Sequence, residues 1–290
     1  MSTIAISGKA ANPMRPAPSV SVFAPPSFLL PAETRPHVAA LFTFMRDTAA
    51  LARDRTLPDN ERLARLAAYD SVLVGSALGE PLTEPAMALR ESLAATGIAA
   101  HHARQILQAR EKEVRTTRMR RWSELLAYCR FAAAPAGRHV LALHGEDAAL
   151  APAAEALGTA ARLLDVVRDC RADFVERGRI YLPADWMREA GCGDAEFARD
   201  RASPELRAVL DRVIERADRL IDEARPGMAQ IRDARLRRWA ATALATCATL
   251  ACAARREDPL AGPIGLSRIQ RLLCLARSFR RSARRGGKVA

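Results

Sequence analysis

The sequence predicts an all-α protein with one large domain. Ala, Leu and Arg, which favour helices, dominate the chain, while glycine contributes only 15 of 290 residues and aromatic residues 5%. No segment alternates apolar and polar residues in the way that a half-buried strand does. Because 49% of the residues are hydrophobic, the chain can bury a substantial core.

The expected helices follow from apolar periodicity and from interruption by proline and glycine. Thr83 is predicted to cap the third helix, with Pro85 in its first turn. Pro226-Gly227 and the stretch 258–265 are the expected loops between the last three helices. The ranges expected to be helical are about 35–55, 59–78, 84–97, 98–115, 122–144 with a bend at 135–137, 150–175, 204–224, 227–256 and 267–284.

The two ends differ in composition from the domain between them. Residues 1–22, rich in Pro, Ser and Ala, are expected to be disordered or loosely packed. The helical domain should cover 23–275, and a basic tail 276–290. This tail is either a solvated end or a segment attracted to an anionic membrane surface, where each basic residue contributes about 1 kcal/mol.

Composition also bears on partners and location. The net charge is +12 and the pI about 10.4, but most basic residues are dispersed and no nucleic-acid motif accompanies them, so no nucleic-acid partner is expected. No charged-then-apolar signal begins the chain, and the uncharged stretch 239–254 is too short to span a bilayer. We therefore expect a cytoplasmic protein, with peripheral contact at the inner face of the membrane as the functional alternative for its tail.

A row of carboxylates is the strongest chemical signal. Asp165, Asp169 and Asp173 are spaced by four, so they project from one side of a helix, each about 40° from the last. Such a row can bind divalent cations, and neighbouring arginines can bind phosphate oxygens. Ion pairs between these aspartates and arginines on a solvated helix face are the alternative. Spacing alone leaves both open.

Short motifs occur in order along nearly the whole chain, and they resemble those of the squalene/phytoene synthase family. They are Ser27-Phe28-Leu29-Leu30-Pro31, Arg35-Pro36-His37-Val38-Ala39-Ala40, Trp122-Ser123-Glu124-Leu125-Leu126-Ala127-Tyr128-Cys129-Arg130, the pair Asp169 and Asp173, and Arg179-Ile180-Tyr181-Leu182-Pro183. Leu143-His144-Gly145-Glu146 and Asp258-Pro259-Leu260-Ala261 resemble one branch, the hydroxysqualene synthases of bacterial hopanoid biosynthesis.

This resemblance implies a single-domain isoprenoid (terpenoid) synthase-type helical bundle with a central cavity. It implies an enzyme that converts presqualene diphosphate to hydroxysqualene and diphosphate, with Mg²⁺ as cofactor and other squalene-pathway enzymes as partners. The alternatives are a squalene or phytoene synthase that uses two prenyl diphosphates, and a catalytically impaired homologue that binds a prenyl lipid or a partner subunit.

The resemblance also implies roles for individual residues. Metal binding would fall to Asp169, Asp173 and Asp54. The reaction would involve Tyr128, whose ring stabilises a carbocation, and three groups around the leaving diphosphate: Arg46, Arg179 and Tyr181. The substrate-binding residues would be Ser27, Arg53, Arg162 and Asp165.

The chain departs from the family pattern in both acidic motifs. After Phe44-Met45-Arg46 the family has clustered aspartates, whereas here alanines and Arg53 occupy most of these positions before Asp54. In the second motif Arg162 and Asp165 replace Gln and Asn. One hypothesis is that Arg53 and Arg162 contact the diphosphate directly, which makes Mg²⁺ weakly bound or dispensable. The other is that turnover is lost while the fold persists.

Overall fold

The computed structural model describes residues 25–286, with side chains described up to 278. Within this range the strand-like pairing amounts to one isolated bridge, between Arg118 and Ile180. The expected all-α fold is confirmed. The predicted loose segment 1–22 lies outside the described residues. Part of the predicted basic tail 276–290 is helical, because the last helix continues to Gly286.

The elements alternate helices with short connections. The α-helices are α1 (Arg35–Arg53), α2 (Asp59–Leu73), α3 (Glu84–Thr96), α4 (His101–Arg115), α5 (Trp122–Leu143), α6 (Ala151–Arg168), α7 (Cys170–Arg177), α8 (Ala184–Ala190), α9 (Pro204–Met228), α10 (Ala234–Arg256) and α11 (Arg268–Gly286). Short 3₁₀ turns are η1 (Ser27–Leu29), η2 (Pro81–Thr83), η3 (Ala148–Leu150) and η4 (Asp194–Ala198).

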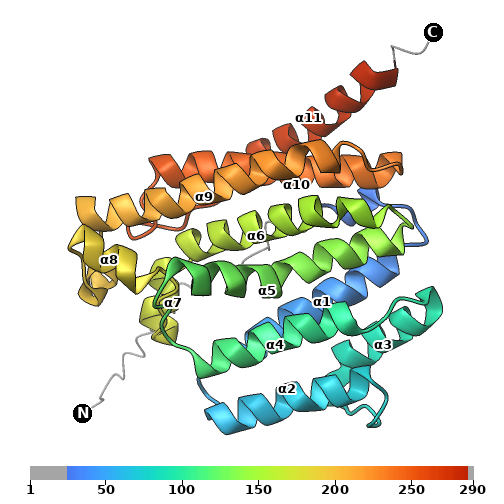
Figure 1. The fold of residues 1–290 in the computed structure, drawn as a ribbon, viewed down its shortest axis with the longest axis horizontal. Coiled ribbons are helices and arrows are strands. Elements are labelled where there is room, and N and C mark those ends of the chain that lie inside the picture. The colour runs from blue at the N-terminus through green and yellow to red at the C-terminus, as the bar shows by residue number, and fades with distance from the viewer. Residues whose placement is uncertain (1–24, 287–290) are drawn as a thin grey trace, which may run out of the picture.

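The helices form a layered bundle around α5 and α6 (Figure 1). On one side α6 packs against α9 and α10, and α11 lies over α10. On the other side α4, α1 and α2 pack below α5, while α7 and α8 close one end. At the end of the bundle that α7 closes, side chains from α1, α4, α6 and α7 come close together.

Several predicted boundaries differ from the structure. The second helix ends at Leu73 rather than near Leu78, because Gly75 takes a left-handed conformation with φ +76°. Thr83 precedes α3, but its hydroxyl donates to the carbonyl of Glu80 and does not cap α3. The expected single helix over 150–175 divides into α6 and α7 at Asp169.

The predicted loop at Pro226-Gly227 was wrong, because α9 continues through both residues to Met228. Proline in a last turn removes only its own N–H bond, which is tolerated when the helix ends soon afterwards. The next helix starts at Ala234, where the Asp233 carboxylate accepts backbone N–H bonds from Arg235 (2.7 Å) and Leu236 (2.9 Å). The side-chain cap, and not the proline, marks this boundary.

Small residues bring α5 and α6 into close contact. A Cβ added to Gly158 of α6 would lie 3.0 Å from the carbonyl oxygen of Ala133 on α5. A Cβ added to Gly137 of α5 would lie 3.0 Å from the Cβ of Ala154 on α6. The alanines and glycines here allow the backbones of α5 and α6 to approach closely.

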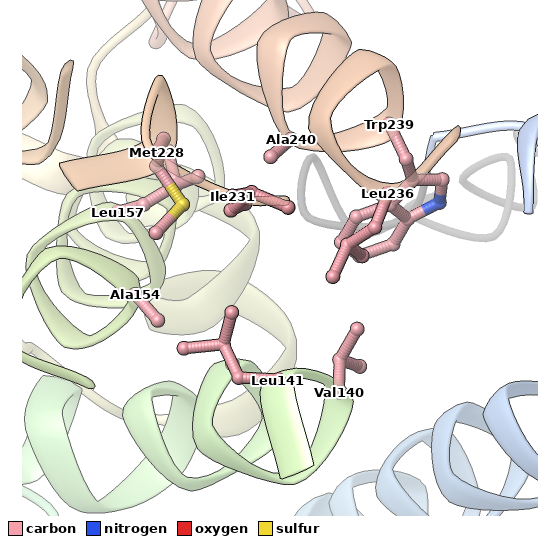
Figure 2. Close-up of a pocket in the computed structure, with 10 residues that line it drawn as sticks. Val140, Leu141, Ala154, Leu157, Met228, Ile231, Leu236, Trp239 and Ala240 are labelled. Atoms are coloured by element: carbon pink, nitrogen blue, oxygen red, sulfur yellow. The ribbon is translucent and has the colours of Figure 1, made fainter. Parts of the chain in front are cut away.

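An apolar cavity of about 20 Å³ lies at the end of the bundle away from α7. Figure 2 shows side chains from α5, α6, α9 and α10 around it, including Leu141, Leu157 and Trp239. Gly137 also lines it. This volume holds about one water molecule, so the interior is filled by side chains at this position.

Within residues 25–286 no helix is both long enough and apolar enough to cross a membrane.

Two buried histidines lie where α4 packs on α5. His139 is fully buried and neither ring nitrogen has a hydrogen-bond partner, and the ring of His102 lies 6.3 Å from it. Burial lowers the pKa of each to about 4, with His101, Arg138 and His37 adding repulsion around them. Both rings are therefore neutral in the folded protein near pH 7.

We predict that stability depends on pH through these rings. In the unfolded chain histidine takes up a proton below about pH 6.5, but the folded protein resists this until about pH 4. The free energy of unfolding should fall as pH is lowered from 6.5 to 4. In His139→Leu it should fall less steeply. Urea unfolding at half-unit pH intervals measures both slopes, and equal slopes would contradict the prediction.

Candidate functional site

A buried carboxylate, Glu113 near the end of α4, lies at the centre of the polar interior. Its Oε1 accepts from the Nε of Arg53 at 2.9 Å and from the Tyr181 hydroxyl, and its Oε2 accepts from Arg110 at 2.9 Å. Burial alone would raise the pKa of Glu113, but the guanidinium groups of Arg53, Arg110 and Arg162 hold it well below its usual range. One ionised carboxylate therefore compensates two arginines.

Arg162 of α6 lies against two tyrosines. The rings of Tyr128 and Tyr181 stack with centroids 5.2 Å apart, and the guanidinium carbon lies 5.2 Å and 5.4 Å from them. One guanidinium nitrogen donates to the Tyr128 hydroxyl at 2.7 Å. The Nε of Arg162 has no partner, and the residue is only 8% exposed. The tyrosine faces compensate part of its charge.

The segment after α7 places Tyr181 in this cluster. Arg179 donates to the backbone carbonyl of Glu113, which ties the segment to α4. The N–H of Ile180 donates to the carbonyl of Thr117 at 3.1 Å, so the segment runs beside the chain that enters α5. Arg179 is buried and has a positioning role here, whereas Tyr181 contacts the other polar groups directly.

The aspartate row faces the protein interior. Arg168 pairs with Asp165 at 2.9 Å and with both carboxylate oxygens of Asp169 at 2.8 and 2.9 Å. Asp173 is 1% exposed and pairs with Arg177 at 2.7 Å. The solvated-face alternative is thus wrong about exposure, but the ion pairs that it expected are present.

Burial and ion pairing act in opposite directions on the three aspartates. Burial raises the pKa of Asp165 and that of Asp173 despite the nearby arginines. Burial also acts to raise the pKa of Asp169, but the two hydrogen bonds and the charge of Arg168 outweigh it, so this pKa is lowered.

These donors do not fit a magnesium site. Hard cations need several oxygen ligands that converge on one point. Here the carboxylates of Asp165 and Asp169 are directed at Arg168, and that of Asp173 at Arg177. Over the described side chains, no three His, Cys, Asp or Glu residues gather in a way that could hold a metal.

Three of the residues expected from the motifs lie apart from this cluster. Ser27 is exposed in η1, next to the opposite end of α1 from Arg53. Arg46 is exposed and its guanidinium reaches Thr43 at 3.4 Å. Asp54 accepts bonds from the hydroxyl and the N–H of Thr56, which lower its pKa.

The structure also adds residues that the motifs did not single out. Glu113 was not among the residues expected at the site, although its position on the buried face of α4 could have indicated it. It lies on the same face of α4 as the buried Ile106 and Arg110, at spacings of seven and three. Arg168 carries no such signal, since many arginines flank the row.

The chain is similar to known proteins over most of its length. The family model described as squalene/phytoene synthase matches residues 20–273. A hydroxysqualene synthase of Sinorhizobium fredii is 30% identical over 85% of this chain and 84% of its own length. One of Zymomonas mobilis is 31% identical over 81% of this chain and 78% of its own length.

Solved structures agree on the fold. A crystal structure of squalene synthase HpnC from Alicyclobacillus acidocaldarius superposes with a TM-score of 0.69 at 26% identity, covering 82% of this chain and 88% of that one. A dehydrosqualene synthase has a TM-score of 0.76 at 19% identity, covering 89% and 90%. The latter likeness concerns the fold alone. The expected isoprenoid synthase-type helical fold is confirmed.

We predict that Glu113→Gln destabilises the protein strongly. Losing a buried carboxylate leaves Arg53 and Arg110 without their counter-ion, and breaking such a pair costs about 3–5 kcal/mol. The control is Glu111→Gln on the same helix, whose 3.3 Å pair with Arg115 is exposed and contributes about 0–1 kcal/mol. Urea unfolding measures both, and similar stabilities of the two variants would show that Glu113 is not the central counter-ion.

Proposed function

Because the chain belongs to the squalene/phytoene synthase family, we propose that it is an enzyme acting on a prenyl diphosphate. The specific reaction proposed is conversion of presqualene diphosphate and water to hydroxysqualene, diphosphate and a proton. The hydroxysqualene synthases of Sinorhizobium fredii and Zymomonas mobilis, similar over most of this chain, support this choice. The matches cover more than three quarters of each of these two proteins.

The observation that carries the proposal is the juxtaposition of Arg162 with Tyr128 and Tyr181. A guanidinium suits a leaving diphosphate, while stacked aromatic faces suit the carbocation that its departure creates. The hydroxyl of Tyr128 accepts from Arg162, so its own proton remains available to a leaving-group oxygen. Groups that can stabilise the negative leaving group and the positive carbocation therefore lie together in the protein interior.

The reaction would proceed by ionisation. The carbon–oxygen bond to the diphosphate breaks, and the electron pair leaves with the diphosphate. The cyclopropylcarbinyl cation rearranges, and a water oxygen bonds to the cationic carbon and loses a proton. This chain would contribute electrostatic stabilisation of the leaving group and a dry, aromatic surface for the cation.

The apolar chains of the substrate need more room than the small apolar cavity at the end of the bundle away from α7 offers. Binding pockets for molecules of this kind measure about 300–1,000 Å³, whereas the apolar cavity between α5, α6, α9 and α10 measures about 20 Å³. Substrate binding would therefore require side chains along α5 and α6 to move apart. Close α5–α6 contact at Gly137 and Gly158 leaves no room between the backbones of these two helices.

The filled interior and the arginine-paired aspartates favour a second candidate. A homologue without turnover would keep the fold and bind a prenyl lipid or a partner subunit. A squalene or phytoene synthase that joins two prenyl diphosphates is the other enzymatic alternative. Product analysis with presqualene diphosphate and, separately, with farnesyl diphosphate distinguishes the three.

We predict diphosphate release and hydroxysqualene formation from presqualene diphosphate by the purified protein. Tyr128→Phe should lower kcat/KM by about 10²-fold, because it removes a donor from the leaving group. Tyr69→Phe is the matched control, since that hydroxyl bonds Asp47 and the carbonyl of Leu82 away from the cluster. Turnover of farnesyl diphosphate alone would favour the two-substrate alternative, and no turnover of either substrate the non-catalytic one.

A further inference from the structure

Arg162 is a buried cation without an anionic partner. Over the described residues it makes no ion pair, whereas Arg53, Arg110 and Arg168 all pair with carboxylates. Its contacts are neutral: the Tyr128 hydroxyl and two aromatic faces. An uncompensated charge in a protein interior is costly, and it persists where a ligand supplies the opposite charge.

The surrounding cluster also carries a surplus of positive charge. Its guanidinium groups outnumber its carboxylates by six to five, a net charge of +1 when all are ionised; the members are Arg53, Arg110, Arg162, Arg168, Arg177 and Arg179 with Glu113, Asp165, Asp169, Asp173 and Glu176. Burial raises the pKa of Asp165 and of Asp173, and protonation of either would increase the surplus. The site is therefore suited to an anion.

The residues that create the surplus are departures from the family pattern. Arg53 occupies a position in the first acidic motif where a carboxylate is expected, and Arg162 one where an amide is expected. Each change adds a positive charge beside the place where a diphosphate would lie. A metal ion supplies such charge when carboxylates are present to hold it, but a guanidinium fork supplies it directly.

We propose that Arg53 and Arg162 bind the diphosphate group of the substrate directly, without a divalent cation. This inference rests on the proposed function for the identity of the natural ligand. Arg53, with 17% of its side chain exposed, is the more accessible of the two. Arg162 is more deeply buried, and its Nε has no hydrogen-bond partner.

Inorganic pyrophosphate is the probe for this site. In EDTA, millimolar pyrophosphate should raise the midpoint of thermal unfolding of the full-length protein as much as it does with excess Mg²⁺. Arg162→Met should abolish that shift. It should also raise the midpoint without ligand, because it removes a buried charge that makes no ion pair. If Arg162 had only a structural role, Arg162→Met would lower the midpoint of thermal unfolding measured without ligand.

Arg130→Met is the matched control, an exposed arginine on the helix that carries Tyr128. It should keep the full response to pyrophosphate. A shift that appears only with Mg²⁺ would overturn the inference, and so would an unchanged shift in Arg162→Met. Turnover measurements separate the two proposals. Hydroxysqualene formation that requires Mg²⁺ would support the proposed reaction and contradict metal-free diphosphate binding. Pyrophosphate binding in EDTA without turnover would support metal-free binding and contradict the proposed reaction.

A different observation concerns the outer face of α11. Cys274 and Ser278 are buried, and the Cys274 sulfur lies 3.3 Å from the Thr249 hydroxyl of α10. On the opposite side the helix exposes an apolar stripe at helical spacing: Ile269 (70% exposed), Leu272 (64%) and Leu273 (50%). Figure 1 shows α11 continuing beyond the body of the bundle.

The basic residues around this apolar stripe indicate which kind of surface covers it. Residues 268–290 contain seven arginines and one lysine and no acidic residue, so they carry +8 of the net charge of +12. The exposed Arg268, Arg271 and Arg277 flank the stripe. A helix with an apolar face between basic residues is typical of one that lies in the surface of an anionic membrane.

We infer that α11 docks this protein on anionic lipid surfaces. The full chain should sediment with vesicles of phosphatidylcholine and phosphatidylglycerol and at least tenfold less with phosphatidylcholine alone. The double variant Leu272→Ser/Leu273→Ser should lose the binding, while Leu78→Ser, at a residue 93% exposed elsewhere, should keep it. Unchanged binding of the double variant would overturn the inference. So would a wild-type dimer that ignores vesicles and becomes monomeric in the double variant.

Discussion

The burial of several guanidinium groups around one carboxylate is the constraint on which this structure depends. Glu113 bonds Arg53 from α1, Arg110 from its own helix and Tyr181 from the segment after α7. Three distant parts of the chain therefore meet at two oxygen atoms. Because charges in a protein interior need partners, this arrangement holds α1 and α4 against the segment that follows α7.

The same requirement explains why the aspartates of the second acidic motif do not converge. Arg168 bonds Asp165 and Asp169 together, and Arg177 bonds Asp173. Each carboxylate is compensated locally, so the surplus positive charge remains at Arg162, beside the stacked rings of two tyrosines. The resemblance implies a family in which carboxylates hold a metal. This chain has arginines at two of the motif positions, Arg53 and Arg162, which we propose bind an anion.

The polar cluster and the apolar interior share two helices. Tyr128 and Arg162 lie at the α7 end of α5 and α6, and the small cavity lined by Gly137 and Leu157 lies toward their other end. Between them, glycine and alanine allow the two backbones to approach closely. A rigid pair of helices with a charged end and an apolar end is consistent with a ligand that has both characters.

The sequence by itself determined the helical class, most helix positions and the family, because periodicity and ordered motifs are local properties of the chain. It also identified Arg53, Arg162, Tyr128 and Tyr181, which the fold brings together. It could not show that Ser27 lies at the other end of α1, or that α9 continues through Pro226. Only the tertiary structure decided which charges pair, since an arginine contacts whichever carboxylate packing places nearby. That packing left Arg162 without an ion pair, beside two stacked aromatic rings.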